Sequence, residues 1–239
     1  DKFELINLQY GNEGFISKDS KDVLVTLKKM GVAVLPSVLS EEECLQMNKG
    51  MWNTAEFLTS GLKIPIKRDD PNTYKSIFDL GLKHGGLIQH HQWAHAQYVW
   101  DVRQNPKVAV VYKELYGDEF LVSFDGVNVS LGPIMSSPRR GFFRGKSWLH
   151  TDQQLCDSSF KCVQSWVTAN RIDVGDATLR FLSGSHLLHE KMAEEFDLKH
   201  TKEDWFIFQP ERIDWFTEQG CVDTCIACPG FNAACRWPN

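Results

Sequence analysis

The sequence predicts a single domain that is mainly β, with flanking helices, and three observations support this prediction. Apolar residues recur at helical spacing in the first half of the chain, whereas the hydrophobic pattern alternates with a period of two from Phe120 onward. The chain has 239 residues, enough for one large β domain with its own core. No internal repeat or low-complexity segment marks a boundary. We therefore expect one domain over residues 1–239, with helices of residues 18–116 packed on strands of residues 120–229.

Composition and charge narrow the class of protein. The formal net charge is -5 and the sequence pI is about 5.9, so there is no electrostatic reason to expect nucleic acid or an anionic membrane as a partner. No apolar run approaches the ~20 residues of a membrane helix, and the first residues lack a secretory signal pattern. The 7 cysteines are odd in number and irregularly spaced, which is not the pattern of a secreted disulfide framework. We expect an intracellular, cytoplasmic protein with mostly reduced thiols.

Two helices and a short strand are expected near the start of the chain. Gly31 is typical of a residue that ends a helix, and Pro36 ends the apolar run that follows it. Ser40 and Glu43 have the spacing of a capping box, with the serine at the N-cap. The expected elements are a helix over residues 18–30, a buried strand over residues 32–35 and a helix from Ser40 to about Phe57.

A third helix and most of the strands follow. Pro106 suits the first position of a helix and Gly117 suits its C-terminal cap. The charged, proline-bearing residues 63–71 are expected to form a loop. The remaining expected elements are a helix over residues 106–116, strands over residues 120–131, 161–169, 177–182 and 221–228, a helix over residues 187–196, and a partly helical aromatic insertion over residues 203–219.

One short stretch has the pattern of a metal site. Trp148, His150 and Asp152 alternate, so a strand would place them on one face. A histidine and an aspartate two residues apart present an imidazole nitrogen and a carboxylate oxygen side by side. They are two of the three ligands of the facial triad that holds non-haem Fe(II) and leaves positions open. The same tripeptide also fits an exposed histidine and aspartate on an ordinary strand.

The segments around this stretch carry a family resemblance. Residues 164–169 form a tryptophan-bearing strand and residues 183–186 read Ser-Gly-Ser-His, while residues 100–106 and 124–126 precede the H-x-D stretch. This order resembles the phytanoyl-CoA dioxygenase-like family of Fe(II)/2-oxoglutarate-dependent oxygenases, over most of the chain from about residue 31 to residue 229. The resemblance implies a double-stranded β-helix, the jelly-roll or cupin-like core, with helices packed outside it.

The same resemblance implies an enzyme, a dioxygenase that uses O2 to hydroxylate a small organic substrate. His150, Asp152 and a second histidine would bind Fe(II), and 2-oxoglutarate would chelate the iron. Trp166 stands where the family often packs a tryptophan beside 2-oxoglutarate, and Asn128 is a candidate hydrogen-bond donor to it. Arg236 is the candidate partner of its far carboxylate, because arginine suits bidentate pairing. The presence of Asp152 favours hydroxylation over halogenation.

The chain departs from the family pattern near its end. The family carries its distal histidine on a strand that follows one like residues 225–229, but this sequence has no histidine after His200. Three explanations are open: the segment with the histidine is missing from this sequence, the chain is a truncated form or isoform, or the metal site is degenerate. The third predicts the alternative function, a catalytically degenerate jelly-roll binding protein that lacks the distal histidine.

Two segments have the composition of a lid over the site. Residues 85–95 contain three histidines, and His91 and His95 would share a helix face. No carboxylate or cysteine completes a metal set nearby, so a polar helix start or a loop at the substrate entrance is favoured over a metal site. Residues 136–145 form a basic, glycine-bearing loop that is either solvated surface or a flexible lid. In the second case Arg139 and Arg140 would help to hold a negatively charged substrate group.

The C-terminal cysteines also have two interpretations. Cys221, Cys225, Cys228 and Cys235 could form a four-thiolate zinc site. However, Cys225 and Cys228 lie three apart in an alternating apolar segment, where a strand directs them to opposite faces. Buried cysteine behaves as a small hydrophobic residue, and we favour that interpretation.

Overall fold

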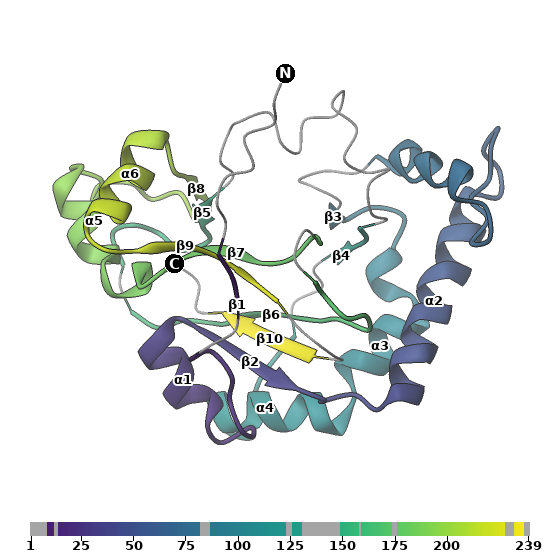
Figure 1. The fold of residues 1–239 in the computed structure, drawn as a ribbon, viewed down its shortest axis with the longest axis horizontal. Helices are drawn as coiled ribbons and strands as arrows, with labels where there is room; N and C mark the ends of the chain where they lie inside the picture. Colours follow the sequence, from purple (N-terminus) through teal and green to yellow (C-terminus); the bar gives the residue numbers. More distant parts are fainter. Residues whose placement is uncertain are drawn as a thin grey trace. The chain divides into compact units, whose positions relative to one another are not determined.

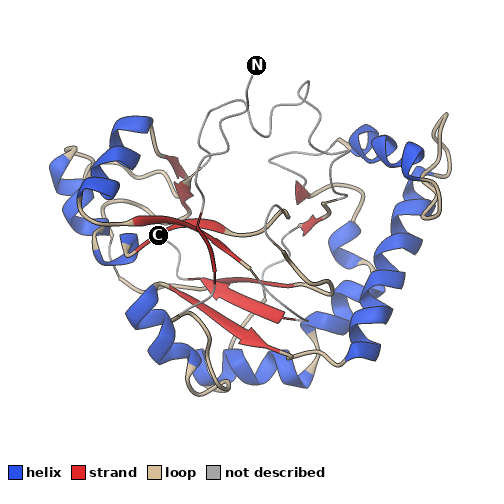
Figure 2. Ribbon diagram, viewed as in Figure 1, coloured by secondary structure: helices blue, strands red, loops and turns tan. Residues whose placement is uncertain are grey.

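The computed structural model describes residues 9–11, 14–81, 87–122, 126–130, 149–157, 159–173, 176–227 and 232–236, with residues 9–10 and 232–236 described as backbone only. The chain divides into two compact units. Their helices and strands are labelled in Figure 1. Unit 1 consists of residues 1–38 and 146–239, and unit 2 of residues 39–145. Helices and strands occur in both (Figure 2). The first helix and strand group with the later strands in unit 1, and the single domain expected over residues 1–239 stays a prediction.

Unit 1 begins with the predicted helix and strand. Helix α1 (Val23–Met30) ends at Gly31, whose φ of 74° is left-handed and whose N–H donates to the Leu27 carbonyl at 2.8 Å. Strand β2 (Val32–Pro36) follows at once, as predicted. The helix starts later than Lys18 because Asp19 Oδ1 accepts the N–H groups of Lys21 and Asp22 at 2.9 and 3.1 Å. This turn competes with helical hydrogen bonding.

The strands of unit 1 form two three-stranded sheets and one short pair. In the first sheet, β9 (Val222–Ile226) lies between β1 (Gln9–Gly11), which is parallel to it, and β7 (Arg180–Ser183), which is antiparallel. In the second, β10 (Asn232–Arg236) lies between β2 and β6 (Gln164–Val167), and both pairings are antiparallel. The separate pair joins β5 (His150–Thr151) to β8 (Phe206–Ile207).

One apolar cluster is shared by the two three-stranded sheets. Its buried members come from β2, from β7 and β9, and from neighbouring loops: Phe15, Val32, Val34, Ile172, Phe181 and Ile226. The rings of Phe15 and Phe181 meet edge to face at 5.3 Å. A core shared by two sheets is how a sandwich or jelly roll buries its apolar faces. The described strands do not close a barrel, and more described residues are helical than extended, so the mainly β jelly roll stays a prediction.

A second apolar cluster supports the short strand pair of unit 1. It gathers residues of α5 (His189–Glu195), α6 (Pro210–Glu218) and the strands beside them: Leu155, Leu182, Met192, Ala193, Phe208, Phe216 and Cys221. Leu149 and Phe206 pack against it. The 3₁₀ turn η5 (Ser185–Leu187) leads into α5, which confirms the helix expected over residues 187–196. The aromatic insertion of residues 203–219 contains β8 and α6, so its expected helical part is confirmed and its strand was not predicted.

In unit 2, the helices with the clearest capping residues in the sequence are present as predicted. In α2 (Glu41–Thr59), the Ser40 hydroxyl accepts the Glu43 N–H at 3.2 Å and the Glu43 carboxylate accepts the Ser40 N–H at 2.6 Å. Helix α4 (Pro106–Tyr116) starts and ends where predicted. Helix α3 (Gln97–Arg103) and the 3₁₀ helices η1 (Pro71–Leu80) and η3 (Trp93–His95) complete the helical part.

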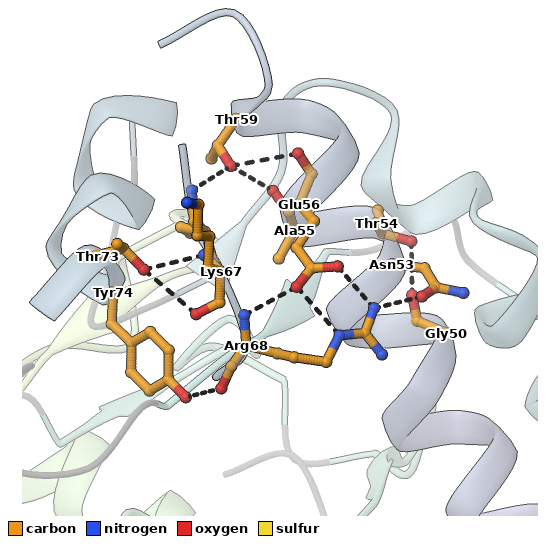
Figure 3. A network of polar contacts seen from close by, with 11 residues as sticks. Gly50, Asn53, Thr54, Ala55, Glu56, Thr59, Lys67, Arg68, Thr73 and Tyr74 are labelled. Carbon is orange, nitrogen blue, oxygen red and sulfur yellow. Dashed lines mark hydrogen bonds and ion pairs between the residues drawn. The ribbon is translucent and has the colours of Figure 1, made fainter. Parts of the chain in front are cut away.

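The charged loop between α2 and η1 is fixed by polar contacts (Figure 3). Arg68 donates to both carboxylate oxygens of Glu56, at 3.0 Å from Nε and 2.7 Å from Nη2. The Thr59 hydroxyl accepts the Ile66 N–H at 2.9 Å, and the Tyr74 hydroxyl donates to the Arg68 carbonyl at 2.6 Å. The predicted loop is therefore present and is tied to both flanking helices.

One expectation for unit 2 is met only in part, and the helix that would have placed His91 and His95 on one face does not include His91. Within residues 120–131 the described strand is only β4 (Val127–Asn128), which pairs with β3 (Leu87–Ile88), whereas Phe120–Val122 are not extended in a sheet and Leu121 is fully exposed. Alternation forms a strand only where a partner is available. His91 has a φ of 58° and precedes η3, so it does not share a helix face with His95. Across the residues described, no helix is long and apolar enough to cross a membrane.

Candidate functional site

The structure brings the two predicted metal ligands together in unit 1. His150 lies on β5 and Asp152 lies in the bend that follows directly, with its side chain beside that of His150. His150 Nε2 is 3.5 Å from Asp152 Oδ1. Two adjacent ligands at ~2.0–2.2 Å from one ion stand roughly 3 Å apart, so this spacing is close to that of a shared metal. The side chains are 13% and 25% exposed.

A neighbouring glutamine orients the carboxylate of Asp152. Gln164, the first residue of β6, donates from Nε2 to Asp152 Oδ2 at 2.7 Å. The hydrogen bond fixes one oxygen, and the other faces His150. Hydrogen bonds of this kind hold a carboxylate ligand in one orientation and tune its affinity for metal.

The β5–β8 pair has two different faces. Thr151 is fully buried and pairs with Phe206, which packs against the second apolar cluster of unit 1. His150 pairs with Ile207 on the opposite face. The Trp205 ring lies 5.8 Å from the His150 ring, at an interplanar angle of 59°. One face of the pair therefore belongs to the core, and the other carries His150.

The loop after Asp152 is held at both ends. The buried amide of Gln153 donates to the carbonyls of Asp157 and Ser159, the latter at 3.1 Å. Gln154 donates from Nε2 to Asp204 Oδ1 at 2.8 Å, and His189 Nε2 lies 3.3 Å from the Gln154 carbonyl oxygen. Burial lowers the pKa of His189, which favours the neutral ring in this position. These contacts fix the backbone directly behind the ligand pair.

The other predicted site residues are placed less completely. Trp166 lies two residues after Gln164 on β6, so it shares a strand face with it, and it packs against the cluster between the two sheets. The Arg236 backbone on β10 pairs with Gln164, but its side chain lies outside the described residues. Asn128 lies in unit 2, on β4 opposite Leu87. The roles of these three toward 2-oxoglutarate stay predictions.

No third metal ligand joins the pair within the described ranges, where no group of three or more histidine, cysteine, aspartate or glutamate side chains is arranged to hold a metal. Cys221 and Cys225 are free and buried, whereas the side chains of Cys228 and Cys235 lie outside the described part of the chain. The candidate lid at residues 136–145, with Arg139 and Arg140, also lies outside it.

Sequence reasoning missed Gln164 and Trp205 as site residues. Gln164 had a weak signal, because it alternates with Trp166 on a predicted strand. Trp205 had none, because the strand β8 that follows it was not predicted and its neighbour His150 is 55 residues away in the chain. Comparisons with protein-family models, with curated proteins and with solved structures found no match for this chain.

Proposed function

We propose that this protein is an Fe(II)/2-oxoglutarate-dependent dioxygenase that hydroxylates a small organic substrate. The observation that carries the proposal is that His150 Nε2 and Asp152 Oδ1 lie side by side, with the second carboxylate oxygen held by Gln164. A nitrogen and a carboxylate oxygen side by side fit two positions of the facial triad. The two sheets that share one apolar cluster support the jelly-roll fold implied by the family resemblance.

The residues have separate tasks in this proposal. His150 and Asp152 would hold the metal, Gln164 would keep Asp152 in one orientation, and Trp166 and Arg236 would contact 2-oxoglutarate. When bound, Fe(II) with 2-oxoglutarate supplies the activation of O2 that the protein side chains cannot supply, and succinate and CO2 are released. The chain positions the donors, and the fixed loop behind them limits their movement.

The second candidate is a catalytically degenerate jelly-roll binding protein. The observation that favours it is that, within the described residues, no third histidine, cysteine, aspartate or glutamate joins His150 and Asp152 in a metal-binding group. An intracellular, cytoplasmic location is part of both proposals, and the free state of the described cysteines supports it.

Metal binding and turnover distinguish the two candidates. Co(II), a redox-stable probe, is titrated into the full chain by calorimetry, and succinate release is measured separately with Fe(II), ascorbate and 2-oxoglutarate. We expect one Co(II) site in the wild type. In His150→Ala and Asp152→Ala we expect its affinity to fall more than about 100-fold, beyond the 10- to 100-fold typical of residues that only orient a ligand.

The matched control is His200→Ala, which removes an exposed histidine of the same unit. It should bind Co(II) like the wild type. Co(II) binding without any succinate release would favour the binding protein. Equal Co(II) affinity in the wild type and in His150→Ala would contradict both the metal site and the enzyme.

A further inference from the structure

The ligand face of the β5–β8 pair is partly apolar. Residues 205 and 207 alternate with the core-facing Phe206, so Trp205 and Ile207 lie on the same face as His150. Ile207 is directly opposite His150 and is half-buried, while the Trp205 ring lies 5.8 Å from the imidazole. Two apolar side chains, Trp205 and Ile207, therefore border the polar donors of the candidate site.

The backbone on both sides of Trp205 is fixed. On one side Asp204 accepts a 2.8 Å hydrogen bond from Gln154, which belongs to the loop that follows Asp152. On the other, Phe206 pairs with Thr151 and anchors its ring in the core, 5.7 Å from the ring of Phe208. An aromatic residue held in this way loses little conformational entropy when a ligand stacks on it.

The apolar ring of Trp205 is partly exposed to water, which is unfavourable, and a ligand-binding role would account for this exposure. The Trp205 side chain is 43% exposed, although its neighbours Phe206 and Phe208 are drawn into the core. The exposed part of this ring, 5.8 Å from the His150 ring, is a flat apolar surface that a ligand can cover.

We propose that Trp205, together with Ile207, is the wall against which the substrate lies, and that the substrate carries a flat, uncharged apolar group such as an aromatic ring. This inference rests on the proposed function, since it places that group beside the metal held by His150 and Asp152. A flat ring suits an indole face better than a puckered ring of the same size, because it makes contact over its whole area. Trp205 is accordingly a specificity-determining residue rather than a metal ligand.

The test uses the full chain loaded with Co(II) and two neutral probes of matched size, benzyl alcohol and cyclohexylmethanol. Affinities are measured by calorimetry, and binding near the metal is followed by the Co(II) visible absorption spectrum. We expect benzyl alcohol to bind more tightly than cyclohexylmethanol to the wild type. Benzyl alcohol should bind roughly tenfold more weakly to Trp205→Ala, the loss typical of an aromatic stacking contact. Trp205→Phe should keep most of the affinity, because it keeps a ring.

The matched control is Leu187→Ala, which removes an apolar side chain that is 70% exposed in the same unit. It should leave the affinity for benzyl alcohol unchanged, and all three variants should bind Co(II) like the wild type. Benzyl alcohol that fails to bind the wild type, binds Trp205→Ala as tightly as the wild type, or responds equally to Leu187→Ala overturns this inference. Failure of the proposed function is a separate result, namely Co(II) binding that does not depend on His150.

Discussion

At the scale of single residues, the two oxygens of Asp152 face different partners. Oδ2 accepts a hydrogen bond from Gln164, and Oδ1 lies beside the imidazole of His150. The H-x-D spacing was enough to predict that His150 and Asp152 lie side by side, because a strand repeats every two residues. The contact with Gln164 could not be predicted, because it joins two strands whose pairing partners lie elsewhere in the sequence.

Replacing Gln164 should weaken the metal site without removing a ligand. We expect Gln164→Leu to lower the affinity for Co(II) by about 10- to 100-fold, because the freed Asp152 carboxylate must be ordered by the metal itself. Calorimetric titration of the full chain measures this change. Gln97→Leu is a matched control, since Gln97 makes a similar 2.8 Å hydrogen bond to Asp101 in unit 2. Equal Co(II) affinity in Gln164→Leu and the wild type would show that the hydrogen bond has no orienting role.

At the scale of elements, capping residues account for the helices that the sequence predicted well. Gly31, Ser40 with Glu43, and Gly117 each ended or began a helix at the expected position. Such capping signals are local, so they can be recognised in the sequence without knowledge of the rest of the fold. Strand β8 lacked them, whereas the 3₁₀ helix η1 has them in Asp70, Pro71 and Gly81 and was still not predicted. Strand β8 pairs with β5, which lies more than 50 residues away in the chain, and residues 120–122 are not in a strand.

The capping box also predicts how α2 responds to acid. Glu43 accepts hydrogen bonds from Lys107 at 2.7 Å, from the Ser40 N–H at 2.6 Å and from Asn105 at 2.8 Å, which together lower its pKa to about 2. The pKa of glutamate in an unfolded chain is about 4.3. Because the folded pKa is the lower one, this stabilisation is complete above about pH 4.3 and is lost as the pH falls toward 2.

Urea unfolding of the wild type and of Glu43→Gln at several pH values between 6 and 3 checks this prediction. The variant should be less stable than the wild type at pH 6, and the difference should shrink as the pH approaches 3. Glu42→Gln, an exposed neighbour in the same first turn, serves as the control and should change stability by less than about 0.5 kcal/mol. A Glu43→Gln deficit that is the same at every pH would contradict the assigned role of its charge.

At the scale of the whole molecule, the order of strands was the part that the sequence could not provide. Strand β10 lies between β2 and β6, and its register pairs Asn232 with Pro36 near the other end of the chain. The alternating pattern identified β6, β7 and β9 as strands, but sheet pairing depends on long-range packing that local sequence does not encode. The membership of the core clusters could not be predicted from the sequence either, because each cluster contains residues from segments that are far apart in the chain.

The cysteines offer a test that spans the whole molecule. Cys44, Cys221 and Cys225 are buried and outside any disulfide, and burial raises the pKa of the Cys44 and Cys221 thiols. Cys156 and Cys162 are exposed, although desolvation also raises the pKa of Cys162. Because the thiolate is the reactive form, the buried group should react slowly in the folded protein. Brief alkylation without reductant, followed by peptide mapping, should therefore modify Cys156 first, then Cys162, and the buried thiols last.

After denaturation, again without reductant, all five of these thiols should become modified. This would support the intracellular expectation, because a secreted framework of this kind would hold its cysteines in disulfides. Fast modification of Cys44, Cys221 or Cys225 in the folded protein would show that the cores around them open readily. A cysteine of this group that stays unmodified after denaturation would reveal a disulfide or a bound metal. If it were Cys221 or Cys225, the zinc interpretation of the C-terminal cysteines would replace the one favoured from the sequence.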